Sequence, residues 1–545
     1  MHVWNRLWIC CALSAVAALP ATAAEPLHVE IDRLIAARAN GTPTAALADD
    51  AEFVRRVYLD LAGRIPTIAE VREFLTDASA DKRERLVDHL LAGPDYPRHM
   101  QEAWHVQWME RQGDNPEWTK FLRESFAANR PWDQMVRQIL HPDPNNETTR
   151  GSAFFFTKRL EHYGENPIDL PGLTRDVGRL FLGRDLQCAQ CHDHLFVDDY
   201  KQADFQGLFT FVKHTYIRTD VKFPAVGEKI VEGPTDFMSV FKKEPRSTGP
   251  RLPGNGEVQV TVFAKGDEFA VEPDKAKNFP GEPKFSPLTI LADQLPRAEN
   301  ADFVRNSVNR FWAQMLGRGL VHPLDLQHSG NPPSHPELLD LLAREFVEHK
   351  FDVKYLLREI ALSQTYQRSS VLPEGVEDSP PELFLVALER PLSAEQIYMS
   401  TLRATGEWER MAPLVEAAGT EAGSKNESAQ ALARFVKAFS NPPREPEGEF
   451  APSVKGALFW AHDTTVLKWL EPREGNLADR MAQLDNAAQA ADELYLSVLS
   501  RRPEETERGL IAALWSTASD RESRGKVAGR LIWSLLSSTE FSINH

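Results

Sequence analysis

The sequence has few cysteines and no long apolar run beyond its N-terminus. Only four cysteines occur in 545 residues, and two of them, Cys10 and Cys11, lie in the apolar N-terminal segment. A fold held together by many disulfides is therefore excluded. After residue 24 no apolar stretch reaches the roughly 18 residues that a membrane-spanning helix needs, which excludes a polytopic membrane protein.

Basic residues are also fewer than acidic residues. The chain has 62 basic against 79 acidic residues and a net charge of −17. Because a nucleic-acid-binding protein needs a basic surface, we expect no nucleic-acid partner. The signatures H-E-x-x-H, G-x-S-x-G and the P-loop do not occur either. The sequence therefore assigns no enzymatic activity.

The first 24 residues have the three parts of a secretory signal peptide. Arg6 precedes an apolar stretch from Leu7 to Leu19, and small residues follow it. Since this stretch is short for a membrane span, we expect cleavage after Ala23 or Ala24 rather than a retained anchor. The mature chain would then have no integral membrane span. We expect it to be exported to the periplasm or to the cell surface, where it would associate with that surface.

Apolar residues recur at helical spacing over most of the chain, as in AEFVRRVYLDLAGRIPT at 51–67. This periodicity predicts a mainly α, multi-helical protein. Gly- and Pro-rich segments with alternating β-branched residues interrupt it at 218–284, which predicts a small β-rich insert. We expect a helical domain over 25–215, an insert or linker over 216–284, and a second helical domain over 285–545.

The motif that carries recognisable chemistry is Cys-Ala-Gln-Cys-His-Asp-His at residues 188–194. C-x-x-C-H is the signature of c-type haem attachment. Two thiols three residues apart on one helical turn project from the same side, where each can form a thioether with a haem vinyl group. The pattern predicts one covalent haem c on Cys188 and Cys191, with His192 as proximal ligand of the haem iron. Electron transfer with an unidentified redox partner is then the expected function, and a redox carrier is favoured over an enzyme.

Other interpretations of the same residues stay open. Cys188, Cys191, His192 and His194 are also the ligand types of a tetrahedral zinc site, or of an iron site. The chain would then be a structural or interaction protein of the cell surface, with His194 as a further non-haem metal ligand. A disulfide or two free thiols are the remaining alternatives.

A sixth iron ligand would have to come from a distant segment. His194 is too close to His192 in the chain to reach the opposite face of the macrocycle, and Met or His is the usual sixth ligand. The candidates are Met100, His105, Met109 and Met135, which we favour, and His328 and His335. The plainer role for each Met is to fill the core.

Long strings on both sides of the motif resemble two known families. DDAEFVRRVYLDLAGRIPTIAEVREFL, DKRERLVDHLLAGPDY and FLGRDLQCAQCHDHLF resemble the planctomycete cytochrome-c-like domain, DUF1549. NSVNRFWAQMLGRGLVHPLDL, FDVKYLLREIALSQTYQRSS and WSLLSSTEFSINH resemble its habitual partner, the planctomycete surface domain, DUF1553. The resemblance implies a secreted or surface-associated bacterial protein without a settled enzymatic activity. It places Cys188, Cys191 and His192 on the family's C-x-x-C-H and His194 on its second histidine.

The chain departs from the family pattern in two places. Leu195 stands where a proline is usual, and PLDLQHSG replaces the usual Pro-x-Asp-Asp-Phe run. The second departure leaves the resemblance without a role for Asp325 or His328.

Overall fold

The computed structural model describes residues 25–418, 426–445 and 453–545, so the expected signal peptide at 1–24 lies outside the described residues. The predicted mainly α class is confirmed, with 54% helix and small two-stranded sheets. No helix in the described ranges is both long enough and apolar enough to cross a membrane.

The first part of the chain is helical up to residue 212. Its elements are α1 (Leu27–Ala39), α2 (Asp50–Ala62), α3 (Ile68–Thr76), α4 (Lys82–Ala92), α5 (Asp95–Met109), α6 (Pro116–Ala127), α7 (Trp132–Leu140), the 3-10 turn η1 (Arg150–Ala153), α8 (Phe154–Arg159), α9 (Leu170–Leu182), the 3-10 turn η2 (Cys188–Gln190) and α10 (Gln202–Val212). Local signals set these boundaries. The Asp49 carboxylate accepts hydrogen bonds from the first amides of α2, and Gly63 ends that helix in the left-handed conformation, with φ +65°.

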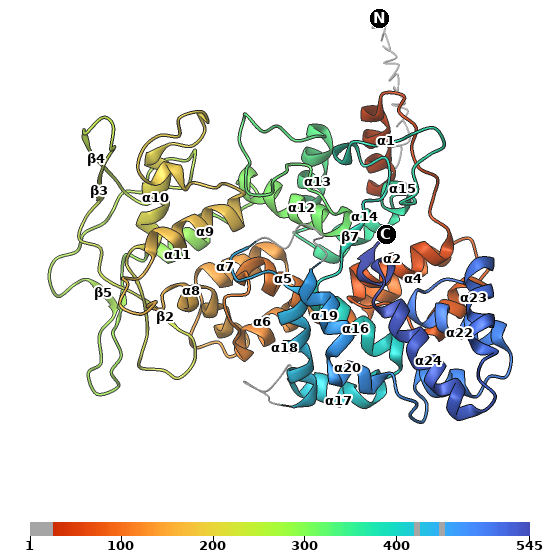
Figure 1. Cartoon of the computed structure of the whole chain (residues 1–545). Coiled ribbons are helices and arrows are strands. Elements are labelled where there is room, and N and C mark those ends of the chain that lie inside the picture. The colour runs from red at the N-terminus through yellow and green to blue at the C-terminus, as the bar shows by residue number, and fades with distance from the viewer. Residues whose placement is uncertain (1–24, 419–425, 446–452) are drawn as a thin grey trace, which may run out of the picture.

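Three short antiparallel hairpins follow, where the sequence predicted a β-rich insert. Their strands are β1 (Thr215–Ile217), β2 (Val226–Glu228), β3 (Thr235–Met238), β4 (Pro245–Thr248), β5 (Phe269–Val271) and β6 (Glu282–Pro283), paired β1–β2, β3–β4 and β5–β6. The hairpins form one end of the molecule (Figure 1). Thr210 of α10 donates to Thr235 of β3 (Oγ1–Oγ1 2.8 Å), which fixes the second hairpin on the helical body.

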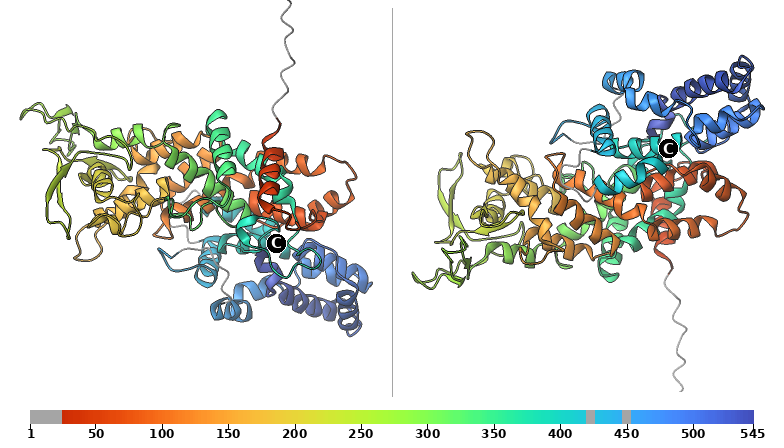
Figure 2. Two further views of the ribbon diagram at one scale, coloured as in Figure 1. Left: turned by 90° about the horizontal axis from the view of Figure 1, so that it is seen from above. Right: turned by 90° about the horizontal axis from the view of Figure 1, so that it is seen from below.

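The second helical part begins with α11 (Pro287–Gln294), α12 (Ala301–Leu316), α13 (Pro336–Glu348), α14 (Val353–Leu362), α15 (Gln364–Gln367) and the 3-10 turn η3 (Pro381–Leu383). It continues with β7 (Arg390–Pro391), α16 (Ala394–Thr405), α17 (Trp408–Ala418), α18 (Glu427–Phe439), α19 (Val454–His462), α20 (Thr464–Trp469), α21 (Leu477–Ala482), α22 (Ala487–Val498), α23 (Glu505–Trp515), α24 (Arg521–Leu536), α25 (Thr539–Ser542) and β8 (Ile543–Asn544). Strand β8 pairs with β7, so the C-terminus returns to the middle of the chain. Figure 2 shows the C-terminal helices set to one side of the remainder.

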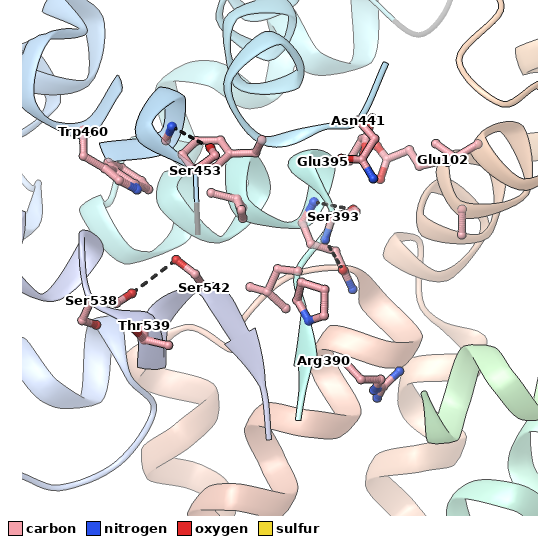
Figure 3. Close-up of a pocket in the computed structure, with 18 of the residues that line it drawn as sticks. Glu102, Arg390, Ser393, Glu395, Asn441, Ser453, Trp460, Ser538, Thr539 and Ser542 are labelled. Atoms are coloured by element: carbon pink, nitrogen blue, oxygen red, sulfur yellow. Dashed lines mark hydrogen bonds between the residues drawn. The ribbon is translucent and has the colours of Figure 1, made fainter. Parts of the chain in front are cut away.

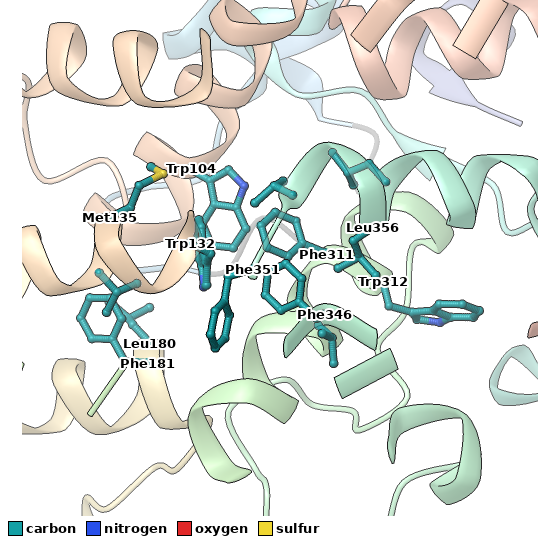
Figure 4. Close-up of a cluster of buried hydrophobic side chains, with 14 of the residues drawn as sticks. Trp104, Trp132, Met135, Leu180, Phe181, Phe311, Trp312, Phe346, Phe351 and Leu356 are labelled. Carbon is teal, nitrogen blue, oxygen red and sulfur yellow. The ribbon is translucent and has the colours of Figure 1, made fainter. Parts of the chain in front are cut away.

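One hydrophobic core runs from Leu27 to Leu385 and so crosses the predicted domain boundary at residue 285. At its centre Trp104 packs against Trp132 (ring centroids 4.4 Å apart) and against Phe311 of α12 (4.9 Å), as Figure 4 shows. Trp104, Trp108, Trp118 and Trp132 are all buried in this core. A second core gathers residues 392–541 and includes Leu59 and Ile65 from the N-terminal part.

Candidate functional site

The cysteine motif follows α9 and is held in place by the second half of the chain. Gly183 ends α9 with φ +67°, a conformation that favours glycine. Its carbonyl oxygen accepts a hydrogen bond from the Gln327 amide (2.8 Å), and the Asp185 amide donates to the Asp325 carbonyl (2.8 Å). The Asp325 carboxylate also pairs with Arg179 of α9 (3.2 Å). The segment around Asp325, which the resemblance left without a role, therefore positions the motif.

The two cysteines lie on one exposed turn. Cys188 opens the 3-10 turn η2, and the Cys191 amide donates to the Cys188 carbonyl (3.4 Å). Both thiols are free and exposed. Residues three apart in a 3-10 turn project from the same side, so the turn presents both sulfurs to the same space.

The His192 ring is oriented by the backbone. Its Nδ1 lies 2.6 Å from the Asp193 carbonyl oxygen. Because a carbonyl can only accept, Nδ1 carries the proton and Nε2 keeps a free lone pair. This is the tautomer of a histidine that binds iron or another metal through Nε2. The Asp193 carboxylate in turn accepts from the Gln202 amide (2.9 Å) at the start of α10.

His194 is held in the opposite tautomer. Its Nδ1 accepts hydrogen bonds from the Val197 amide (2.9 Å) and the Phe196 amide (3.2 Å). The proton of the neutral ring therefore sits on Nε2, and neither nitrogen has a free lone pair. The His194 ring packs edge-on against Tyr200 (centroids 6.0 Å apart). Within the described ranges, no three His, Cys, Asp or Glu side chains come close enough to hold a metal ion.

The candidate sixth ligands from the N-terminal part are packed in the core. Met100, Met109 and Met135 are fully buried. The Met109 sulfur lies 3.6 Å from a guanidinium nitrogen of Arg159, and Nδ1 of His105 accepts from the Trp118 indole (3.0 Å). These side chains fill and link the core, which is the plainer role that the sequence allowed.

His328 and His335 lie in different surroundings. His335 is buried against Phe384 (ring centroids 5.8 Å apart). His328 packs on Tyr200 (5.4 Å), the same ring that His194 contacts. Burial lowers the pKa of His328, the Asp199 carboxylate opposes this effect, and the neighbouring His194 adds a smaller lowering. His328 is thus the candidate that shares a neighbour with the motif.

An apolar rim beside the motif was not recognised in the sequence. We define it as Leu195, Phe196, Met238, Val240 and Phe241, all more than half exposed. The Val240 amide donates to the Cys191 carbonyl (3.1 Å), and the Phe241 ring lies 4.7 Å from that of His192. A cluster of exposed apolar side chains marks a ligand or partner site. The apolar string MSVF at 238–241 was the available signal, but the insert gave no indication that it folds back onto the motif.

Comparisons with known proteins identify both halves of the chain. Residues 30–216 match the family PSCyt2, described as a protein of unknown function (DUF1549). Residues 289–515 match the family PSD1, likewise a protein of unknown function (DUF1553). No curated protein and no solved structure matches the chain. The order and bounds of the two matches confirm the resemblance: the chain belongs to the proteins that join an N-terminal PSCyt2 (DUF1549) domain to a C-terminal PSD1 (DUF1553) domain.

Proposed function

We propose that this protein is an exported, single-haem c-type cytochrome-like protein that carries electrons at the cell surface or in the periplasm. The observation that carries the proposal is the apolar rim around two exposed thiols and one oriented imidazole. A haem is a large and mostly apolar plane, so its covalent attachment on a surface needs apolar side chains beside the anchoring cysteines. Here the Phe241 ring lies beside His192, and the exposed Leu195 and Phe196 follow the motif directly in the chain.

The chain's own groups match the requirements for attachment. Cys188 and Cys191 would each form a thioether by adding the S–H bond across a vinyl group, which needs no oxidant. His192 would offer its Nε2 lone pair to the iron while Nδ1 stays hydrogen-bonded to the Asp193 carbonyl. A haem held here would supply one-electron redox chemistry.

The opposite tautomers favour haem over a four-ligand zinc or iron site. Such a site would use His194 as well as His192. His194 could bind a metal only by giving up two backbone hydrogen bonds to Nδ1 or by losing the Nε2 proton. The c-type haem needs only one histidine of the motif and leaves the Phe196–Val197 turn intact.

A visible absorption spectrum of the exported protein tests the proposal. We expect sharp reduced-form bands that persist after acid–acetone extraction, since thioethers survive that treatment. The double variant Cys188→Ala with Cys191→Ala should lose haem-linked peroxidase staining on a denaturing gel, whereas His194→Ala should keep it. A colourless, zinc-containing protein, or persistent stain in the double variant, would overturn the proposal.

The rim can be tested separately. Replacing Phe196 and Phe241 together by serine should lower the haem content of the exported protein, because the apolar surface beside the attachment turn is lost. Leu510→Ser is the matched control, since Leu510 is 68% exposed but lies on α23 in the second core region. Equal haem content in both variants would show that the rim does not support haem attachment.

A further inference from the structure

A cavity of about 670 Å³ lies between the two cores, and no residue of the cysteine motif lines it. Helix α5, whose other face enters the first core, forms one wall together with the start of α16. Helices α19, α24 and α25 form the opposite wall. Small-molecule sites typically measure about 300–1,000 Å³ and are common between packed domains. Its size and place make the cavity a candidate for a small ligand.

Two carboxylates mark one end of the cavity. Glu102 of α5 accepts hydrogen bonds from Arg98 (2.9 and 3.1 Å), and Glu395 in the first turn of α16 accepts a bidentate pair from Arg111 (2.9 and 3.2 Å). Their side chains are 18% and 12% exposed. Figure 3 draws both carboxylates, with Asn441, at the same end of the pocket. They are enclosed by protein yet face the cavity.

The surroundings shift the pKa values of Glu102 and Glu395 in opposite directions. Burial raises the pKa of Glu102, and the charge of Glu395 raises it further against the opposing effect of Arg98. Burial also raises the pKa of Glu395, but the hydrogen bonds from Arg111 outweigh burial and hold that pKa below its ordinary value. Glu395 is therefore the more readily ionised of the two, while Glu102 takes up a proton more readily.

Two glutamines add acceptors to the same wall. Gln107 of α5 and Gln314 of α12 both line the cavity. Each has a buried side-chain carbonyl oxygen without a hydrogen-bond partner in the described structure. An unsatisfied buried acceptor costs free energy, so the wall favours a ligand with several hydrogen-bond donors.

The charges of the wall are already balanced. Arg98 pairs with Glu102, Arg111 pairs with Glu395, and Arg390 pairs with Asp60, which also lines the cavity. An ionic ligand would find no net charge to neutralise. The ligand that fits this wall is therefore neutral, and its donors are hydroxyl or amide groups.

Aromatic rings line the other side. Trp460 of α19 lies across the pocket from Glu102 in Figure 3, and Trp533 of α24 lines the cavity with 38% of its surface exposed. The Trp533 Nε1 donates to the Trp460 carbonyl (2.7 Å), so its polar atom is occupied and the rest of its ring is apolar surface. A molecule with an apolar face and hydroxyl groups around its edge matches both walls.

We propose that this cavity binds a neutral carbohydrate, with sugar hydroxyls donating to Glu395 and Gln107 and an apolar sugar face against Trp533. Such a site is independent of the haem proposal, because the two share no residue. The protein would then combine a redox site near one end with a sugar site between its two cores.

Saturation-transfer NMR on the mature chain from residue 25 tests the inference, with cellobiose and maltose as neutral probes and glucosamine as a cationic probe. We expect transfer to a neutral sugar at millimolar concentration. Glu395→Gln and Trp533→Ala should each weaken it by about tenfold or more. Glu522→Gln is the matched control, because Glu522 is 82% exposed and does not line the cavity.

Three results would contradict the carbohydrate proposal. Absence of transfer to both neutral sugars in the wild-type chain would overturn the inference, as would unchanged binding in both cavity variants. Tighter binding of glucosamine would overturn the neutral character of the ligand. Circular dichroism shows whether each variant is folded, and Trp533→Ala keeps the test valid should Glu395→Gln fail to fold. Loss of haem in the cysteine variants leaves the expected sugar binding unchanged, so the two proposals fail separately.

Discussion

Arg390 donates hydrogen bonds to both carboxylate oxygens of Asp60, each 2.8 Å long, across 330 residues of sequence. Asp60 also accepts from the Tyr366 hydroxyl (2.7 Å) and from the side-chain Nδ2 of Asn544 (2.8 Å). Burial raises the pKa of Asp60, and Arg390 and Tyr366 oppose the rise. One buried carboxylate on α2 thereby joins the N-terminal helices, strand β7 and the C-terminus.

Asp60→Ala should lower the free energy of unfolding by about 3 kcal/mol, because it removes the buried carboxylate that accepts from Tyr366 and Asn544 and leaves the half-buried Arg390 guanidinium without its counter-charge. Urea denaturation followed by circular dichroism measures the change. Glu522→Ala breaks an ion pair with Lys526 in which both side chains are more than two-thirds exposed, and it should cost less than about 0.5 kcal/mol. Similar losses in the two variants would mean that the Asp60 network does not hold the fold together.

The helices could be predicted from sequence because their signals are local. The spacing of Phe53, Val54 and Val57 and the stop at Gly63 lie within a few residues of one another. The partnership of Asp60 with Arg390 has no such signal, since a charge on one helix does not indicate which of 62 basic residues will meet it.

The candidate site, like the helices, was predictable from sequence only where its signal is local. Cys188, Cys191 and His192 are recognisable by spacing alone. The apolar rim depends on a hairpin that folds back through the hydrogen bond from Val240 to Cys191. An apolar residue in a sequence, such as Phe241, does not reveal whether it is buried or exposed, so the rim could be seen only in three dimensions.

Two glycines should respond in opposite directions to alanine. A Cβ at Gly151 would overlap the Glu117 carbonyl and lie 2.9 Å from the Trp118 amide, so backbone must shift between η1 and α6. We expect Gly151→Ala to lose about 2 kcal/mol of stability. Gly509 lies inside α23 with nothing within 4 Å of its Cβ position. Gly509→Ala should therefore gain about 0.5–1 kcal/mol, read from the same urea curves. A loss at Gly509 would contradict the open space at that position.

The mature N-terminus tests the export proposal. N-terminal sequencing of exported protein should begin near Ala24 or Glu25, after the small residues that signal peptidases accept. The control is Leu13→Arg, which places a charge in the apolar stretch and should leave the precursor uncleaved. Intact Met1 in a membrane fraction of the wild-type would indicate a retained anchor instead.

The junction between the β insert and α11 should make stability depend on pH through Glu228. Its carboxylate accepts hydrogen bonds from the Leu288 amide (2.9 Å) and from the Ser286 hydroxyl at the start of α11. Burial raises the pKa of Glu228 from 4.5 to about 7, although both hydrogen bonds act to lower it. In the folded protein this group therefore holds its proton at pH values where the unfolded chain has released it.

The sign of the effect follows from proton binding. The folded state binds more protons than the unfolded state between about pH 4.5 and 7, so the stability contributed by Glu228 is complete below this window and falls as pH rises through it. Glu228→Gln imitates the protonated carboxyl and cannot lose a proton. We expect the free energy of unfolding of Glu228→Gln minus that of the wild-type to increase from pH 4.5 to pH 7 and to level off above it. Urea titrations at a series of pH values measure this difference, with the exposed Glu522→Gln as control. Parallel stability profiles for Glu228→Gln and the wild-type across the window would show that Glu228 ionises at an ordinary pKa and that the junction is open to water.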